Sequence, residues 1–250
     1  MAKRFFYLFL LFYLFSFYAD RKSDLLPDSS SLREELVEPP SQEEVDEEGY
    51  KFSYRGRDYY VEPKADYSMT GLVVSRNNIS AFSDIHHTKD SVDFMDLCLI
   101  WGENTLNDGY LGVEFWSQPF SCWYQIRERA AAQGFDGKNL SNTHLLSADP
   151  VIVGKMASVR PGDQISVSGK LVDYAPALYP ELKRKTSLVR GDTGNGACEV
   201  MMVENFRLLE EANQGWRKVL WLSIKGYRLF LMLSLIFFFK ETYWPKRRIV

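Results

Sequence analysis

The segment 160–174 reads Arg160-Pro161-Gly162-Asp163-Gln164-Ile165-Ser166-Val167-Ser168-Gly169-Lys170-Leu171-Val172-Asp173-Tyr174 and decides the expected fold. Its first four residues are typical of a tight turn. After the turn, apolar Ile165, Val167 and Leu171 alternate with polar residues, which predicts a strand with one buried face. Gly169 interrupts the alternation where a strongly coiled strand needs a bulge. The segment therefore predicts a strand of a curved sheet.

Short apolar runs separated by turn residues extend this pattern over residues 50–210. Helix is expected only at Ile126–Gln133 and at Asp149–Val159, where Asp149 can cap and Pro150 can begin the helix. The predicted fold class is mainly β with minor helix, a small barrel or sandwich flanked by two hydrophobic membrane helices. The nine expected strands are Tyr50–Tyr54, Tyr59–Val61, Thr70–Ser75, Phe94–Trp101, Tyr110–Trp116, Ser121–Ile126, Gln164–Tyr174, Ser187–Arg190 and Ala197–Leu208.

The C-terminal half of this region resembles an OB-like barrel. Over residues 149–209, a helix, a Pro-Gly-Asp turn, a Gly-interrupted strand and a long strand follow in that order. The runs Asp96–Gly102, Ser141–Leu146 and Asp192–Glu199 also look like those of uncharacterised bacterial membrane proteins. The resemblance implies a membrane-anchored protein with an OB-like β-barrel region, and it implies no activity.

Apolar segments lie near both ends of the chain. Residues 5–19 carry no charge, and the bulky Phe17-Tyr18-Ala19 ending does not suit a signal-peptide cleavage site, so a retained anchor is expected over a cleaved signal. Residues 219–239 contain Lys225 and Arg228 toward one end, where long cationic side chains can reach the headgroups. A spanning helix is expected there, with an interfacial helix as the alternative.

The predicted organisation has five parts: an anchor at 1–19, an acidic disordered tether at 20–49, a β-rich extracytoplasmic domain at 50–212, a membrane or interfacial helix at 213–240 and a basic tail at 241–250. The tether is predicted because residues 34–48 hold eight acidic side chains and no basic one. Basic residues at both ends favour a cytoplasmic location for both. This places residues 20–218 in the periplasm of a bacterial inner membrane.

The charge balance bears on the expected partners. The 250 residues hold 30 Lys and Arg against 33 Asp and Glu, a net charge of −3, and the cluster Lys183-Arg184-Lys185 lies in an expected loop. A phosphate-binding face needs clustered basic residues, so no nucleic-acid partner is expected. The expected partners are the lipid bilayer and a protein of the cell envelope, and no cofactor is expected.

Two groups of residues are binding candidates. Trp116, Phe120, Trp123 and Tyr124 belong to an expected hairpin, where they form either core or a flat apolar patch. Asp192 and Asn195 lie in the glycine-rich turn 190–199. That turn can form a ligand-facing nest, but the Asn-Gly pair favours a tight hairpin.

Two histidines and two carboxylates lie close together at residues 84–90. Asp84, His86, His87 and Asp90 could ligate a divalent metal, but adjacent histidines point to opposite faces of a strand, so no metal site is expected.

Cys98, Cys122 and Cys198 could pair with His144 as nucleophile and base. Cys98 and Cys198 instead suggest core positions, and a Cys98–Cys122 disulfide is preferred over catalysis.

The expected function is therefore a membrane-anchored, non-enzymatic binding or assembly module of the cell envelope. The alternative is a membrane-bound hydrolase that uses a His/Asp metal site or a Cys/His pair.

Overall fold

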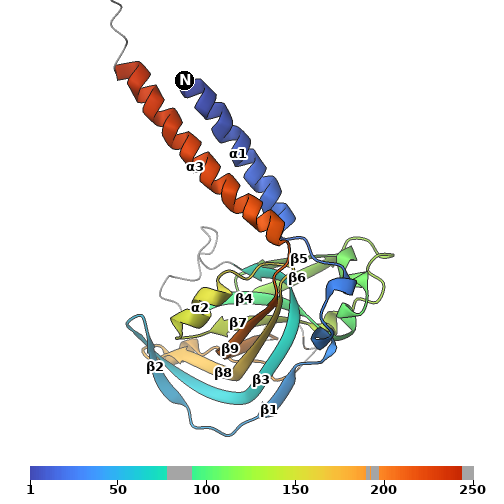
Figure 1. Cartoon of the computed structure of the whole chain (residues 1–250). Helices are drawn as coiled ribbons and strands as arrows, with labels where there is room; N and C mark the ends of the chain where they lie inside the picture. Colours follow the sequence, from blue (N-terminus) through green and yellow to red (C-terminus); the bar gives the residue numbers. More distant parts are fainter. Residues whose placement is uncertain (78–91, 190–191, 193–196, 244–250) are drawn as a thin grey trace, which may run out of the picture. The chain divides into compact units, whose positions relative to one another are not determined.

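A computed structural model describes residues 1–77, 92–189, 192 and 197–243. The chain divides into two compact units (Figure 1). One unit joins Met1–Leu25 to Asn213–Val250, and the other is Leu26–Ala212.

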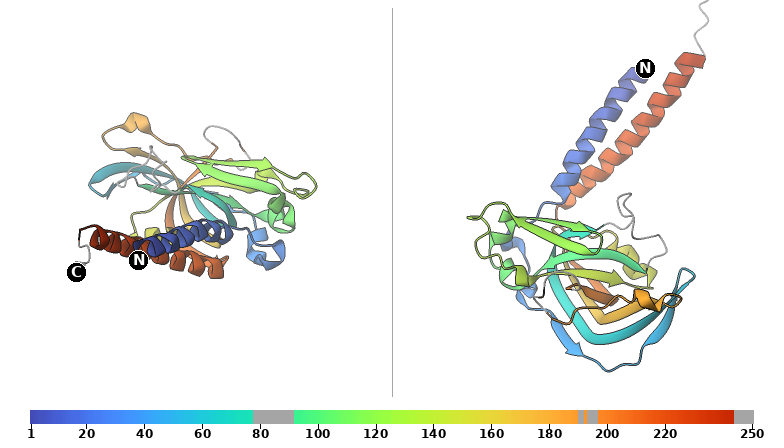
Figure 2. Two further views of the ribbon diagram at one scale, coloured as in Figure 1. Left: turned by 90° about the horizontal axis from the view of Figure 1, so that it is seen from above. Right: turned by 180° about the vertical axis from the view of Figure 1, so that it is seen from behind.

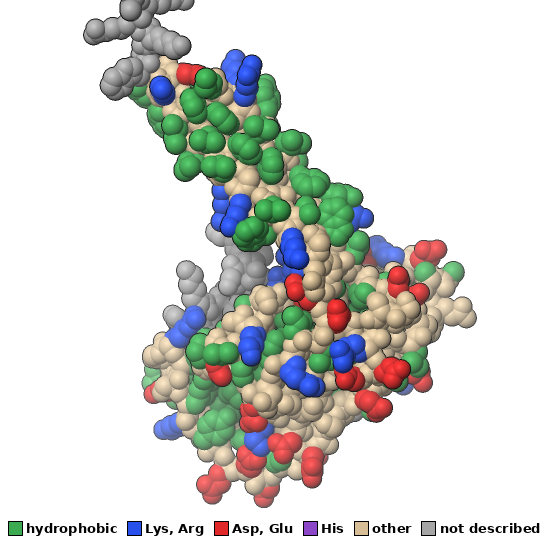
Figure 3. Space-filling view, in the orientation of Figure 1, with side chains coloured by type: hydrophobic (Ala, Val, Ile, Leu, Met, Phe, Trp, Pro, Cys, Tyr) green, Lys and Arg blue, Asp and Glu red, His purple; other side chains and the backbone are tan. Residues whose placement is uncertain are grey.

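The first unit is a pair of helices, α1 (Ala2–Ser23) and α3 (Gln214–Tyr243), that run side by side in opposite directions (Figure 2). The amino group of Met1 contacts Glu241 at 2.8 Å, and at the other end the Asn213 amide donates to the Leu25 carbonyl at 2.7 Å. In the described part of the chain, these two helices are long and apolar enough to cross a membrane. Apolar side chains cover much of the visible face of the pair (Figure 3), and the prediction of two hydrophobic helices is confirmed at this level.

Aromatic side chains join the two helices. The ring of Phe5 stacks on Phe237 with centroids 5.2 Å apart, and Phe12 meets Phe230 at 5.3 Å. A Cβ atom at Gly226 would lie 2.4 Å from Phe12 Cδ1, so the helices approach closely there because residue 226 has no side chain.

The second unit is built on a mixed sheet, which among the described residues has seven strands in the order β1-β3-β4-β7-β9-β8 with β2 paired to β3. β7 and β9 run parallel, and the other neighbours run antiparallel. A two-stranded hairpin, β5–β6, and a short helix, α2 (Pro150–Met156), complete the unit. The strands are β1 (Ser41–Glu44), β2 (Tyr50–Tyr54), β3 (Arg57–Asn77), β4 (Asp93–Ile100), β5 (Val113–Gln118), β6 (Ser121–Ile126), β7 (Leu140–Leu146), β8 (Gln164–Pro176) and β9 (Glu199–Glu210).

The prediction of a small barrel or sandwich is wrong: the described chain is mixed α/β, with three α-helices and one seven-stranded sheet that is not a closed barrel. β3, a 21-residue strand, merges two expected strands and pairs with β8 as well as with β4. Ala65 of β3 pairs with Glu44 of β1 on one edge and with Leu171 of β8 on the other. One edge of this long strand therefore serves β2, β1 and β4 in succession, while the other serves β8.

The segment expected to be a disordered tether contributes to the fold from Leu26 to Glu44. Leu36 is fully buried in a cluster with Leu72 and Tyr110, and the Arg33 backbone N–H donates to Gln164 Oε1 at 2.8 Å. The acidic residues stay largely exposed while the leucine between them is buried. The average composition of the segment does not reveal that this leucine is buried.

The strand read from residues 164–174 is confirmed as part of β8. Ile165, Val167 and Leu171 lie in the largest core cluster. At Gly169 the register with β9 shifts, and a Cβ atom there would lie 2.1 Å from the Met202 carbonyl oxygen. The glycine is therefore required by the close approach of β9.

The expected helices had different outcomes. α2 begins where predicted, with Asp149 Oδ1 accepting the Val151 N–H at 2.7 Å. Residues 127–133 form turns instead of the expected helix. β1 and β7 were not expected, and residues 187–189, expected to begin a strand, have no regular structure.

Candidate active site

Strand pairing gathers four polar or sulfur-bearing side chains on one face of the sheet. Asp96 of β4 pairs with His144 of β7, and Cys98 pairs with Asn142 two residues away. Because side chains alternate along a strand, these four lie on the same face. Cys198 lies just before β9, the parallel neighbour of β7.

Asp96 and His144 form a buried pair. Their side chains are 0% and 3% exposed, and His144 Nδ1 lies 2.5 Å from Asp96 Oδ1. The other carboxylate oxygen accepts the Phe120 N–H at 2.9 Å. Burial by itself lowers the pKa of His144, but hydrogen bonds to Asp96 and Cys198 and the charges of Asp96 and Asp93 outweigh burial and raise this pKa to about 10. The pair is therefore an imidazolium–carboxylate ion pair at neutral pH.

The Cys198 thiol lies beside this pair. It donates to the Phe120 carbonyl with sulfur and oxygen 3.6 Å apart, and it accepts from Asn142 Nδ2 at 3.4 Å. It also shares a hydrogen bond with the His144 ring. Nδ1 of His144 is engaged by Asp96, which leaves Nε2 for the thiol. Cys198 thus contacts His144, and His144 contacts Asp96. This is the arrangement that a nucleophile, its base and an orienting carboxylate require.

Phe120 connects the β5–β6 hairpin to this group. It lies at the hairpin turn with φ at +63°, a left-handed conformation that is unfavourable for a bulky side chain. Its N–H contacts Asp96 and its carbonyl contacts Cys198, so both backbone groups are used. The hairpin is also fastened to β4 by the Cys98–Cys122 disulfide, which confirms the pairing preferred from the sequence.

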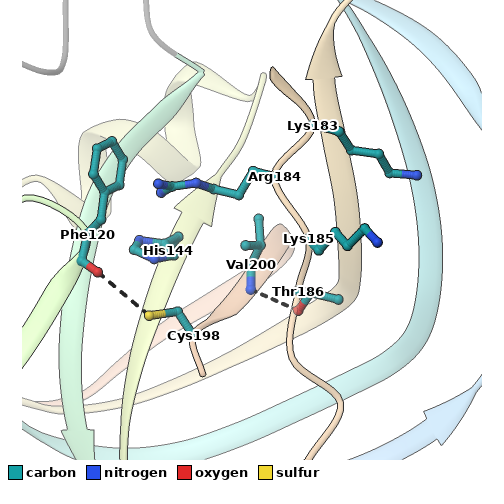
Figure 4. Close-up of a pocket in the computed structure, with 8 residues that line it drawn as sticks. All are labelled: Phe120, His144, Lys183, Arg184, Lys185, Thr186, Cys198 and Val200. Carbon is teal, nitrogen blue, oxygen red and sulfur yellow. Dashed lines mark hydrogen bonds between the residues drawn. The ribbon is translucent and has the colours of Figure 1, made fainter. Parts of the chain in front are cut away.

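A cavity of about 510 Å³ opens over the group (Figure 4). His144 and Cys198 lie on one side of it, and Arg184 extends toward the Phe120 ring. The volume is adequate for a small organic group at the thiol. The cavity is lined by Phe120, His144, Lys183, Arg184, Lys185, Thr186, Cys198 and Val200.

Asp93, Asp96 and His144 are close enough to be considered as metal ligands, since one ligand atom from each lies within 4.8 Å of the others. Two ligands of one tetrahedral zinc ion lie about 3.4 Å apart, given metal–ligand distances of about 2.1 Å. Asp96 and His144 are in direct hydrogen-bond contact at 2.5 Å. Their arrangement therefore fits a proton-sharing pair better than a metal centre.

The predicted aromatic candidates have different environments. Trp116 and Trp123 pair across β5 and β6 and are 37% and 51% exposed. Tyr124, on the opposite face of the hairpin, packs against Phe135 with centroids 5.3 Å apart. Only Phe120 of these aromatic candidates lines the cavity.

Of the remaining predicted candidates, the structure describes Asp192, which is not among the residues that line the cavity. Asp192 is exposed and accepts the Ser187 hydroxyl at 2.6 Å. Asn195, Asp84, His86, His87 and Asp90 lie outside the described residues.

Sequence reasoning grouped Asp96 with the histidines at 86 and 87 and not with His144, assigned no site role to Asn142 or Arg184, and interpreted Cys198 as core. The segment Ser141–Leu146 carries no signal of period two, because its residues are buried on both faces of β7 and each face carries two polar residues followed by a leucine.

Comparisons of the chain with known protein families, curated proteins and solved structures find no match. The resemblance to bacterial membrane proteins therefore stays a prediction, and the argument for function depends on the site itself.

Proposed function

We propose that residues 26–212 form a cysteine-dependent hydrolase domain of a membrane-anchored protein. The single observation that carries this proposal is the contact series Cys198, His144, Asp96 at the wall of a cavity. Nucleophilic cysteines need a base within reach and an open approach, and both are present here.

The proposed reaction is acyl transfer to water. The thiol of Cys198 loses its proton to solvent, and the resulting thiolate, beside the His144 imidazolium, adds to the carbonyl carbon of an ester or amide. The imidazolium gives its Nε2 proton to the leaving group, which departs as an alcohol or amine and leaves a thioester on Cys198. Neutral His144 then takes a proton from water, whose oxygen adds to the thioester carbonyl; the C–S bond breaks, which releases a carboxylic acid and restores the thiolate–imidazolium pair.

Asp96 and Asn142 are positioning residues in this scheme. Asp96 fixes the ring of His144 and stabilises the imidazolium, in accord with the raised pKa of about 10. Cysteine nucleophiles react as thiolates, which a neighbouring imidazolium stabilises. The amide of Asn142 donates toward the same sulfur and adds to that stabilisation.

The proposed location is the inner membrane of a bacterium, with the catalytic domain in the periplasm. The start of α1 and the end of α3 lie at the same end of the helix pair. Lys3, Arg4 and Lys240 are near that end. Basic flanks favour the cytoplasmic side. A disulfide supports an oxidising compartment for the domain.

Topology is tested by labelling in a Cys198→Ala background, which removes the native free thiol. Ser41→Cys, at an exposed site in β1, should react with a membrane-impermeant maleimide in intact spheroplasts. Thr242→Cys, at the end of α3, should react only after permeabilisation. The reverse pattern would contradict the proposed orientation.

The catalytic proposal is tested with p-nitrophenyl acetate and purified full-length protein in detergent. We expect a burst of p-nitrophenol, an acetyl group on Cys198 by mass spectrometry, and loss of both in Cys198→Ala. His144→Gln should reduce hydrolysis by about 100-fold or more. His86→Gln is the matched control and should retain activity. Hydrolysis that survives Cys198→Ala, or that depends on His86 instead of His144, would overturn the proposal.

A second candidate function, the binding or assembly module predicted from sequence, is favoured by the exposed Trp116–Trp123 pair. Paired exposed tryptophans suit a protein partner in the envelope. This candidate predicts a protein that co-purifies from native membranes, is lost in Trp116→Ser/Trp123→Ser and is retained in Cys198→Ala. Absence of such a protein would remove this candidate.

A further inference from the structure

We infer that the group presented to Cys198 carries a carboxylate, and that Arg184 binds it. This inference rests on the proposed function, because it assigns a substrate class to the same cavity. It is carried by the position and surroundings of the Arg184 side chain.

Arg184 is held in place by its backbone and by its side chain. Its N–H and carbonyl both pair with Tyr174 at the end of β8, at 2.8 and 2.9 Å. Its guanidinium carbon lies 3.7 Å from the centre of the Phe120 ring, within the range of a cation–π contact. Phe120 also contacts Cys198, so the guanidinium and the thiol belong to one cavity wall.

One nitrogen of this guanidinium, the buried Nη1 of Arg184, has no hydrogen-bond acceptor among the described residues. A buried donor without an acceptor is destabilising, and more so when it carries charge. Arg184 itself lines the cavity and is only partly buried, so a ligand there that turns the guanidinium toward it would supply the missing acceptor.

Two lysines also line the cavity. Lys183 lies 2.6 Å from Glu62 and 3.5 Å from Asp173, so its charge is balanced within the protein. Lys185 is exposed to solvent, whereas Arg184 is partly buried and packs against Phe120, which makes Arg184 the better candidate for ligand recognition.

The walls of the cavity are cationic, because Lys183, Arg184 and Lys185 line it and Asp96 is paired with the His144 ring. A cationic wall favours an anionic substrate, and the planar oxygens of a carboxylate match the guanidinium fork. The proposed substrate is thus an ester or amide that bears a free carboxylate near the reacting carbonyl.

Two alkylating reagents of similar shape test this inference on the full-length protein in detergent. Iodoacetate carries a carboxylate and iodoacetamide does not. With the Cys98–Cys122 disulfide intact, Cys198 is the free thiol, and mass spectrometry locates the adduct. We expect the iodoacetate-to-iodoacetamide rate ratio to fall about tenfold in Arg184→Gln, equivalent to one charge-assisted hydrogen bond.

Lys155→Gln, an exposed lysine on α2, is the matched control and should leave the ratio unchanged. Arg184→Lys keeps the charge without the fork and should give an intermediate ratio. A further measurement uses the wild-type protein and asks whether a small anion protects Cys198 from labelling. Sodium acetate should slow the reaction of Cys198 with iodoacetamide, whereas sodium chloride at equal ionic strength should not.

The outcomes separate this inference from the proposed function. A reactive Cys198 with an unchanged ratio in Arg184→Gln, or without protection by acetate, overturns the role of Arg184 and leaves the hydrolase proposal standing. Protection by phosphate but not by acetate overturns the carboxylate assignment. Failure of both reagents to label Cys198 contradicts both proposals, because the thiol would then be inaccessible.

Discussion

His144 Nδ1 lies 2.5 Å from Oδ1 of Asp96, and the two residues face each other across β4 and β7. Both side chains are buried, so removing one partner leaves the other without compensation. The pair therefore links the chemistry of the site to the stability of the domain.

The first prediction concerns this pair and pH. The pKa of His144 is about 10 in the folded chain and about 6.5 when unfolded, so its stabilising effect is complete below about pH 6.5 and is lost as pH rises through 10. Asp96→Asn should lower the free energy of unfolding at pH 7 by roughly 3–5 kcal/mol and flatten its decline from pH 7 to 10. Urea unfolding at several pH values measures both effects.

Asp66→Asn is the control for this prediction. Asp66 is exposed and pairs with Lys170, so its substitution should change stability by less than about 1 kcal/mol. Equal slopes in wild type and Asp96→Asn would show that His144 is not held as an imidazolium.

The second prediction concerns Glu199. Burial raises its pKa to about 7, with hydrogen bonds to its own backbone and to Ser141 acting in the opposite direction. Below about pH 4.3 the Glu199 carboxyl is protonated in both the folded and the unfolded chain and does not lower the free energy of unfolding. As the pH rises from there through 7, the unfolded chain loses this proton more readily, and the free energy of unfolding falls. Glu199→Gln should therefore raise the unfolding free energy at pH 8 by roughly 2–3 kcal/mol relative to wild type.

At pH 4 the same substitution should be nearly neutral. Glu204→Gln, an exposed neighbour on β9, should have little effect at either pH. Destabilisation by Glu199→Gln at pH 8 would mean that the carboxylate is charged and compensated in the folded chain.

The third prediction compares two glycines. Gly169→Ala places a Cβ atom 2.1 Å from the Met202 carbonyl oxygen and should lower the unfolding free energy by about 2–4 kcal/mol. Gly154→Ala, in α2 with open space around the added atom, should be neutral or stabilising by about 0.5–1 kcal/mol. Thermal unfolding of both variants checks this, and equal effects would contradict the required approach of β9.

The fourth prediction concerns the disulfide. Cys98→Ala/Cys122→Ala releases the β5–β6 hairpin from β4 and should lower the unfolding free energy by about 3 kcal/mol. It should also slow acylation of Cys198, because Phe120 contacts both Asp96 and Cys198. If p-nitrophenyl acetate hydrolysis were unchanged at a temperature where the variant is folded, the hairpin would have no role in the site.

The sequence by itself determined features that depend on neighbouring residues. The two apolar helices follow from uninterrupted hydrophobic runs, and β2 and β6 begin and end at the predicted residues because turn residues bound them. The start of α2 follows from the capping geometry of Asp149. These features involve interactions within a few residues, which a local pattern contains.

Only the tertiary structure decided which distant residues meet. Asp96, His144 and Cys198 come together through one antiparallel and one parallel strand pairing, and a change of register by one residue would send their side chains to opposite faces. Leu36 is buried only because β3 and β4 supply its neighbours. Strand register and burial depend on packing between segments far apart in the chain, and that information is absent from any short stretch of sequence.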